Sequence, residues 1–270
     1  MNELVTFRTV GEELVLTTGR WLLERQHDLK KIKTTKDTGD LVTKGDDEAS
    51  DRLINVLRGR FPGIPIICEE TCESAIDIPE SWALVVDPVD GSSNFSRGSN
   101  HWAVSIGLVK DGISQAGCCW TPGQDGKGEL FFADVAGARL NGKLISPSTI
   151  DSLKQAVVLT DWPWDLERRP FTVQFMEKMY PLVRQIKIMG SAVADICDVA
   201  CGRVDMYFHP GLKPWDIAAA GRIAERAGCI VYSGEHKIEG WSPWQQSFFV
   251  CTHALTADPL GLLYRIFVEN

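Results

Sequence analysis

The chain has 270 residues, which is enough for one large α/β domain and excludes a small fold that depends on disulfides. Hydrophobic residues make up 44% and charged residues 24%, as in ordinary globular proteins and unlike disordered or fibrous ones. There are 28 lysines and arginines against 36 aspartates and glutamates, and this net charge of −8 argues against a nucleic-acid polymer as partner.

The sequence contains no signal for a membrane or for secretion. No apolar run reaches the roughly 18 residues that a membrane span needs, and Glu3, Arg8 and Glu12 interrupt the first twenty residues. We therefore expect a cytoplasmic protein with no membrane contact. The eight cysteines are expected to be reduced thiols, because a chain of this length builds a core of its own.

The first half of the chain predicts two helices followed by a set of strands. Apolar residues at spacings of three and four predict an amphipathic helix over 3–26, and a polar hairpin or loop follows over 27–39. A second helix is predicted over 46–60, where a Phe-Pro-Gly breaker ends it. Tight-turn signals such as Asn141-Gly142 indicate mostly antiparallel pairing among the strands. These strands are expected at 64–68, 82–86, 102–109, 114–120 and 129–133.

From about residue 150 strands alternate with helices, which predicts a layered second half. Strands are expected at 156–160, 186–189, 206–208, 229–232 and 247–251. Helices are expected at 172–184, 191–201, 215–227 and 259–268. Neither an internal repeat nor a flexible linker divides the chain. We therefore predict a single domain over 1–270, with an N-terminal α+β lobe over about 1–148 and a C-terminal α/β lobe over about 149–270.

The most informative stretch follows the strand predicted at 82–86. That apolar strand leads directly into Asp87, and Pro88 imposes an extended or turn conformation, so Asp87 is expected at a strand end. Asp90 comes three residues later, and the carbonyl of Val89 between them is free to point at the same place. Oxygen ligands of this kind suit Mg²⁺. The alternative is an ordinary turn in which the aspartate side chains bond to nearby backbone N–H groups and hold no metal.

Gly91, Ser92 and Ser93 follow these acids without a gap. If they begin a helix or a turn, their backbone N–H groups form an anion-binding concavity beside the metal. Metal ions next to such a group of amides would form a site that binds phosphoryl oxygens.

Further acidic residues strengthen this interpretation. Glu69 and Glu70 follow the strand predicted at 64–68, Asp46 begins the second helix, and Asp216 lies between a tryptophan and small apolar residues. A carboxylate in apolar surroundings needs a partner, and a cation is the simplest one.

These motifs resemble those of the inositol monophosphatase family in their order and spacing. The matching segments are Asp40-Leu-Val-Thr43 with Asp46, Glu69-Glu70, Asp87-Pro-Val-Asp-Gly-Ser-Ser-Asn-Phe95 and Trp215-Asp-Ile-Ala-Ala219. The resemblance spans most of the chain. It implies an α+β fold arranged as a layered αβαβα sandwich, two or three Mg²⁺ ions per site, inhibition by Li⁺, and hydrolysis of a small phosphate monoester by a metal-activated water.

The resemblance also implies roles for individual residues. The metal ligands would be Glu69, Asp87, the Val89 carbonyl, Asp90 and Asp216. Asp46, Glu69 and Ser92 would act on the attacking water, and Ser92 stands where the family usually has threonine. The phosphate would lie on the N–H groups of Gly91, Ser92 and Ser93. Secondary candidates are Glu70, reached through water, and Lys36, near the phosphate.

The resemblance further places substrate recognition in the second half of the chain, next to Asp216 itself. Gly190, Ser191 and Ala192 would read substrate hydroxyls together with residues before the Trp-Asp motif, among them His209. Inositol-specific members carry glutamate where this chain has His209. A neutral imidazole offers one donor and one acceptor in place of an acceptor-only carboxylate, which argues against myo-inositol phosphate as the preferred substrate.

The sequence therefore predicts a Mg²⁺-dependent phosphatase, expected as a homodimer, that hydrolyses an inositol monophosphate or a related sugar or polyol phosphate. Alternatives within the superfamily are 3′-phosphoadenosine 5′-phosphate, fructose 1,6-bisphosphate and histidinol phosphate. A non-enzymatic alternative is a regulatory protein that binds a metal or a phosphosugar. We favour the enzyme because every metal carboxylate of the family motif is present in this sequence.

Overall fold

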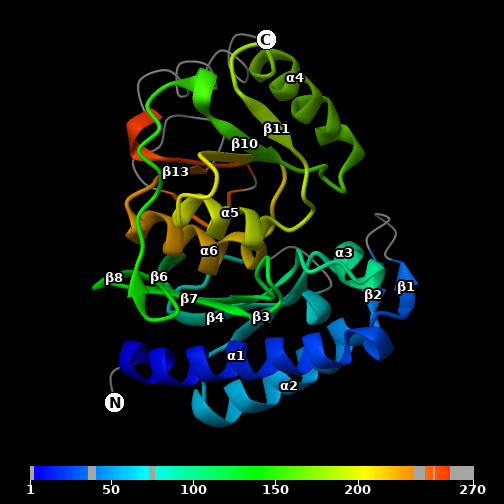
Figure 1. The fold of residues 1–270 in the computed structure, drawn as a ribbon. Helices are drawn as coiled ribbons and strands as arrows, with labels where there is room; N and C mark the ends of the chain where they lie inside the picture. Colours follow the sequence, from blue (N-terminus) through cyan, green and yellow to red (C-terminus); the bar gives the residue numbers. More distant parts are fainter. Residues whose placement is uncertain (1–2, 36–40, 73–76, 234–240, 246, 256–270) are drawn as a thin grey trace.

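The chain folds into five layers in the order helices, sheet, helices, sheet, helix (Figure 1). This is a computed structural model, and it describes residues 3–35, 41–72, 77–233, 241–245 and 247–255. The layers confirm the predicted αβαβα sandwich of α+β type. The helix that we predicted over 259–268 lies outside the described residues.

Two long helices form the first layer. Helix α1 (Glu3–Leu29) confirms the predicted helix and continues three residues further, and α2 (Lys44–Arg60) lies beside it. The short strands β1 (Ile32–Thr35) and β2 (Leu41–Thr43) pair antiparallel between them. Helix α2 begins at Lys44 because Thr43 and Asp46 form a capping box, in which the Asp46 carboxylate accepts the Thr43 N–H at 2.8 Å.

The second layer is a seven-stranded sheet in which only β3 and β4 are parallel, so the prediction of mostly antiparallel pairing is correct. The turn between β8 and β9 places Asn141 and Gly142 at φ +49° and +78°, as a tight hairpin turn requires. The strand bounds, in sheet order, are β3 (Ile66–Cys68), β4 (Trp82–Asp90), β5 (Ala103–Lys110), β6 (Ile113–Thr121), β7 (Glu129–Asp134), β8 (Gly137–Leu140) and β9 (Lys143–Leu144).

Strand β4 corrects one prediction. We expected the strand to stop at residue 86 and to leave Asp87 at its end, whereas β4 continues to Asp90. The pairing register shifts between Asp87, opposite Ser105, and Asp90, opposite Ala103, so β4 has one extra residue there. Such a bulge accommodates Pro88, which has no N–H to give to the neighbouring strand. The six-residue helix α3 (Ser92–Arg97) follows directly.

The fourth layer is a five-stranded mixed sheet in which β10 pairs parallel with β11 and β12. Its strands are β11 (Gln185–Lys187), β10 (Val157–Thr160), β12 (Met206–His209), β14 (Phe248–Cys251) and β13 (Ile230–Ser233). The last layer, α4 (Arg169–Met179), lies against its outer face. We predicted this helix over 172–184. It begins earlier because Pro170 fits a first helical turn, and it ends earlier because the chain must extend to reach β11.

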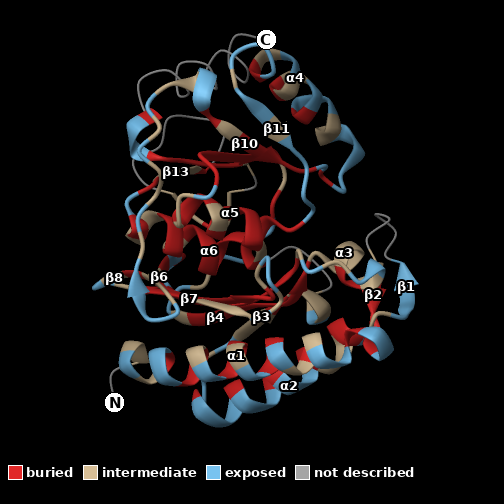
Figure 2. Cartoon of the chain, in the orientation of Figure 1, coloured by how far each residue is buried: buried red, intermediate tan, exposed pale blue. Residues whose placement is uncertain are grey.

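Between the two sheets lie α5 (Ala192–Ala200) and α6 (Pro214–Ala227), which Figure 2 shows buried on most sides. Glycines in the large sheet allow α6 to approach it closely. A Cβ atom on Gly117 would lie 2.4 Å from the Ala219 carbonyl oxygen, and one on Gly107 would lie 2.8 Å from the Ala218 Cβ. This packing brings the first turn of α6, with Asp216, over strand β4.

The remaining elements are four short 3-10 turns, at Glu69–Thr71, Leu153–Gln155, Leu166–Arg168 and His253–Leu255. All eight cysteines are free thiols. Within the described residues, no helix has the length and apolar composition to cross a membrane.

Candidate metal centre

Three aspartates from two elements converge between the large sheet and α6. Asp87 and Asp90 lie on either side of the bulge in β4, and Asp216 lies in the first turn of α6. One carboxylate oxygen from each lies within 4.8 Å of the others. Asp87 and Asp90 are buried, and Asp216 is half-buried. An oxygen-only, acidic set of this kind fits Mg²⁺ rather than zinc, which prefers histidine and cysteine ligands.

The electrostatics of the cluster also fit a cation. Burial raises the pKa of Asp87 well above its usual value, and the nearby charges of Glu69, Asp90, Asp216 and Asp46, in that order, raise it further. Burial raises the pKa of Asp90 to about 7, although hydrogen bonds from Ser191 and from the Val193 backbone oppose the shift. Because these carboxylates repel one another in a poorly solvated place, a divalent cation between them would remove the conflict.

Glu69 and Glu70 lie in the short 3-10 turn that follows β3, the strand paired with β4. Glu69 is the neighbouring charge with the largest effect on Asp87, which places it beside the cluster as the family motif implies. Both glutamates are half-buried. Their roles as ligand and as peripheral acid remain predictions.

Asp46 and Ser92 form a hydrogen-bonded pair beside the metal carboxylates. The Ser92 hydroxyl donates to one Asp46 oxygen, while the Thr43 N–H and hydroxyl donate to the other. Burial raises the pKa of Asp46, and these hydrogen bonds partly oppose the shift. The Ser92 Oγ also lies 2.9 Å from the Val89 carbonyl oxygen, whose second lone pair is still available to a metal.

Gly91 is the turn that links β4 to α3. Its φ of +89° lies in the left-handed region, and a Cβ there would lie 3.0 Å from the Gly190 carbonyl oxygen and 3.2 Å from that of His101. Glycine is therefore required at this position. Of the two possibilities that the sequence left open, a helix or a turn, the structure has a helix, which begins at Ser92. The N–H groups of its first turn have no partners within the helix. Binding of a phosphate by Gly91, Ser92 and Ser93 remains a prediction.

The segment 190–192 meets the metal centre directly. The Ser191 hydroxyl and the Val193 N–H both donate to the same Asp90 oxygen, the latter at 2.8 Å. Ser191 also caps α5 by accepting the Ala194 N–H at 3.3 Å, and Ala192 begins the helix. The segment that follows β11 in the five-stranded sheet thus fixes the orientation of the Asp90 carboxylate on the seven-stranded sheet. Asp216 is fixed similarly, because one of its oxygens accepts the Lys213 N–H at 2.7 Å.

His209 lies at the end of β12 and is 5% exposed. Burial lowers its pKa to about 4, so the imidazole is neutral at physiological pH. Its Nδ1 accepts the Gly211 N–H at 3.0 Å, and the ring also hydrogen-bonds to the Trp162 backbone. The bond from Gly211 engages the acceptor nitrogen that a substrate hydroxyl would have used.

Sequence reasoning did not identify Asp161, Asp195 or His101 as part of the site. Asp161 follows the apolar strand β10 in the way that Asp87 follows the start of β4, so the same pattern could have identified it. Asp195 lies on the buried face of α5, where the sequence offered no signal beyond an acid among apolar neighbours. Lys36 lies outside the described residues.

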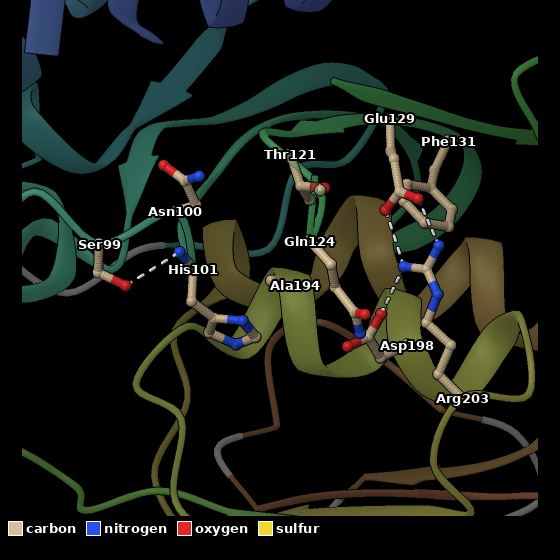
Figure 3. Close-up of a pocket in the computed structure, with 11 residues that line it drawn as sticks. Ser99, Asn100, His101, Thr121, Gln124, Glu129, Phe131, Ala194, Asp198 and Arg203 are labelled. Atoms are coloured by element: carbon tan, nitrogen blue, oxygen red, sulfur yellow. Dashed lines mark hydrogen bonds and ion pairs between the residues drawn. The ribbon is translucent and has the colours of Figure 1, made fainter. Parts of the chain in front are cut away.

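A polar cavity of about 300 Å³ lies beside the first turns of α5, with His101 at one end and the ion pair of Arg203 with Asp198 and Glu129 at the other (Figure 3). Neither the three clustered aspartates nor Glu69 lines it. This cavity is therefore separate from the carboxylate cluster.

Comparison with known proteins decides the family. The model of the inositol monophosphatase family matches residues 3–263, which is nearly the whole chain. This chain belongs to the inositol monophosphatase family. Members of this family are metal-dependent, and the structure has a cluster of acidic residues at Asp87, Asp90 and Asp216.

Relatives within the inositol monophosphatase family carry two kinds of name. An inositol-1-monophosphatase of Synechocystis is 33% identical over 239 residues, which cover 85% of this chain and 79% of that protein. A Nus factor SuhB of Pasteurella multocida is 36% identical over 243 residues, which cover 87% of this chain and 84% of that one. The solved structure of a Thermotoga maritima IMPase superposes with a TM-score of 0.82 at 26% identity, covering 97% of this chain and 98% of that one.

Proposed function

We propose that this protein is a Mg²⁺-dependent phosphatase that hydrolyses a small phosphate monoester, either an inositol monophosphate or a related sugar or polyol phosphate. The observation that carries this proposal is the convergence of Asp87, Asp90 and Asp216 beside the Asp46–Ser92 pair. Membership of the inositol monophosphatase family supports it.

The ligands of the metal would be Glu69, Asp87, the Val89 carbonyl, Asp90 and Asp216. When bound there, Mg²⁺ supplies positive charge that offsets the repulsion between a phosphate dianion and its nucleophile. The N–H groups of Gly91, Ser92 and Ser93 would hold the phosphate oxygens at the start of α3.

The Asp46–Ser92 pair would remove a proton from the attacking water. The Ser92 hydroxyl donates to Asp46, so its oxygen can accept a hydrogen bond from a water molecule and orient it. The proton would then pass through Ser92 Oγ to Asp46. Burial raises the pKa of Asp46, which makes this carboxylate a stronger base than a solvated aspartate.

Recognition of the rest of the substrate would depend on Gly190, Ser191 and Ala192. His209 is neutral, and its Nδ1 already accepts the Gly211 N–H, so this position offers no carboxylate to bind ring hydroxyls. This arrangement favours a substrate other than myo-inositol phosphate. Candidates include other sugar phosphates, 3′-phosphoadenosine 5′-phosphate, fructose 1,6-bisphosphate and histidinol phosphate.

A second candidate function rests on the relatives named Nus factor SuhB. Those names support a regulatory protein that binds its partners without turnover. We favour the phosphatase because three aspartates cluster near a hydrogen-bonded pair, Asp46 and Ser92, that could accept a proton, which a protein that only binds partners would not need. Sensitivity to Li⁺, a homodimeric state and a cytoplasmic location remain predictions, and sedimentation analysis would decide the oligomeric state.

The proposed function is tested by phosphate release with Mg²⁺ from a panel of sugar phosphates, inositol phosphates, nucleotides and histidinol phosphate. We expect release from one or a few members, inhibition by Li⁺, and loss of activity in Asp90→Asn. Asp47→Asn is the matched control, because Asp47 lies on the same helix as Asp46 but at the surface, where it pairs with Lys33. Absence of release across the panel, with Mg²⁺ bound, would favour the regulatory function.

A further inference from the structure

A second group of buried polar residues lies beneath the loop that carries Gly190. Asp161, just after β10, accepts the Gly190 N–H at 2.7 Å and the Met189 N–H at 3.2 Å through the same oxygen. Its other oxygen lies 3.3 Å from the Tyr207 hydroxyl, which donates to it. Asp161 is 8% exposed. One carboxylate therefore holds two successive backbone amides of this loop.

Asp195 extends the group into helix α5. Its side chain is fully buried, and its Oδ1 lies 2.7 Å from Nε2 of His101. Burial lowers the pKa of His101, so the ring is neutral and donates from Nε2. The second oxygen of Asp195 is buried without a donor, yet the side chain is in hydrogen-bond contact with Asp161.

Two ionised carboxylates cannot hydrogen-bond to each other, because neither has a proton to donate. The contact between Asp161 and Asp195 therefore requires one shared proton. Asp195 is fully buried and receives one hydrogen bond, from His101, so we place the shared proton on Asp195. Burial and the charge of Asp161 raise its pKa well above its usual value, in agreement with this placement. Asp195 then accepts from His101 through Oδ1 and shares its proton with Asp161.

The loop is also held from the other side. The Asn94 side-chain amide of α3 lies within hydrogen-bond distance of three carbonyl oxygens, those of His101 at 2.7 Å, Met189 at 2.7 Å and Gly190 at 3.2 Å. The peptide between Met189 and Gly190 is thus held through its N–H by Asp161 and through its oxygen by Asn94. The preceding peptide is held by Asp161 through the Met189 N–H, and the following one by Asn94 through the Gly190 oxygen. The next residue, Ser191, donates to the Asp90 carboxylate.

We propose that Asp161 and Asp195 are positioning residues, whose shared proton anchors the loop at Gly190 and thereby sets the Asp90 carboxylate for metal binding. The proposal rests on the proposed function in so far as Asp90 is a metal ligand. It requires a hydrogen-bond donor at position 195 and does not require a charge there.

Asparagine and leucine at position 195 separate these two requirements. Asp195→Asn keeps an oxygen for His101 and supplies an N–H for Asp161, whereas Asp195→Leu has a similar branched shape, is larger, and has neither group. The control is Asp198→Asn, one turn further along α5, where Asp198 pairs with Arg203 at the far end of the cavity (Figure 3). Mn²⁺ binding by calorimetry and by electron paramagnetic resonance reports on the site without any substrate.

We expect Asp195→Asn and Asp198→Asn to bind Mn²⁺ within about twofold of the wild type, and Asp195→Leu to bind roughly 10- to 100-fold more weakly, the usual cost of losing a group that orients a ligand. Circular dichroism and thermal unfolding establish that each variant is folded. If Asp195→Leu does not fold, Asp161→Ala gives the same test, because it removes the acceptor for the Met189 and Gly190 amides.

Equal Mn²⁺ binding by Asp195→Leu and the wild type would overturn the proposal. Weakened binding in Asp195→Asn to the same extent as in Asp195→Leu would also overturn it, because a charge would then be required. A wild type that binds Mn²⁺ but releases no phosphate would contradict the proposed function alone, since the anchoring is measured through the metal.

Discussion

Two groups of buried carboxylates lie close together in this protein and differ in their hydrogen-bond donors. Asp161 receives two backbone amides and a tyrosine hydroxyl, and it shares a proton with Asp195. Asp87 accepts one local N–H, from Val89 at 3.1 Å, and the four charges that most affect it are all carboxylates. The negative charge of the first group is offset by hydrogen bonds and a proton within the protein, whereas that of the second group needs a cation. Burial of an acid alone therefore does not identify a metal site, and Asp161 differs from Asp87 in the number of donors that it receives.

The largest expected effect comes from removing a carboxylate of the second group, the cluster of Asp87, Asp90 and Asp216. Asp87→Asn removes the most buried carboxylate of the cluster, so we expect metal affinity to fall by more than about 100-fold, beyond the cost of losing an outer-shell partner. Without metal, the variant should unfold at a higher temperature than the wild type, because one of the mutually repelling charges is gone. Calorimetric unfolding with and without Mg²⁺ measures both effects. A metal-free variant that is less stable than the wild type would contradict the view that these charges conflict.

The Asp46–Ser92 pair gives the next largest effect. Ser92→Ala removes the hydroxyl that bonds to Asp46, and we expect kcat to fall by roughly 10²- to 10⁴-fold with little change in KM, as for loss of a proton-transfer group. Ser92→Thr should retain activity because it keeps the hydroxyl. Ser93→Ala is the matched control, since Ser93 would act only through its backbone N–H. Steady-state kinetics on the substrate identified by the panel provide the test, and equal losses in the Ser92 and Ser93 variants would argue against a specific role for the hydroxyl.

A smaller effect comes from the packing that brings the two sheets together. Gly117→Ala would place a Cβ 2.4 Å from the Ala219 carbonyl oxygen, so α6 must move away from the sheet. We expect the free energy of unfolding to fall by about 1–3 kcal/mol, the usual cost of overpacking. Metal affinity should fall as well, because α6 carries Asp216. Gly59→Ala is the control, since a Cβ there meets no atom within 4 Å. Unchanged metal binding in the Gly117 variant would show that the position of α6 does not limit the site.

The last expected effect is a pH dependence of stability. The pKa of Asp90 is higher in the folded protein, about 7, than the 3.8 of an ordinary aspartate, so the folded metal-free protein binds more protons than the unfolded chain. Its contribution to stability is therefore complete below pH 3.8 and is lost as the pH rises through about 7. In the presence of a chelator, we expect the unfolding temperature of Asp90→Asn minus that of the wild type to increase as the pH rises through this interval. A difference that is constant with pH would contradict the raised pKa.

The sequence was sufficient to predict that three of the carboxylates proposed as metal ligands meet. Asp87, Asp90 and Asp216 stand in short segments whose order identifies the family, and the structure brings their oxygens within 4.8 Å of one another. The helices at the start of the chain were equally predictable, because their apolar spacing reflects local geometry. The extension of β4 to Asp90 was not, since the strand continues past Pro88 only because a bulge forms against β5.

Tertiary structure alone decided what surrounds those carboxylates. Asp161, Asp195 and His101 are far apart in the sequence, and no local pattern shows that they meet beneath the loop at Gly190. The sequence showed that His209 replaces an acid, but only the fold shows that the Gly211 amide engages its acceptor nitrogen. Local sequence determines which groups a strand or helix presents, whereas the hydrogen-bond donors that balance a buried charge come from elements that only the folded chain brings together.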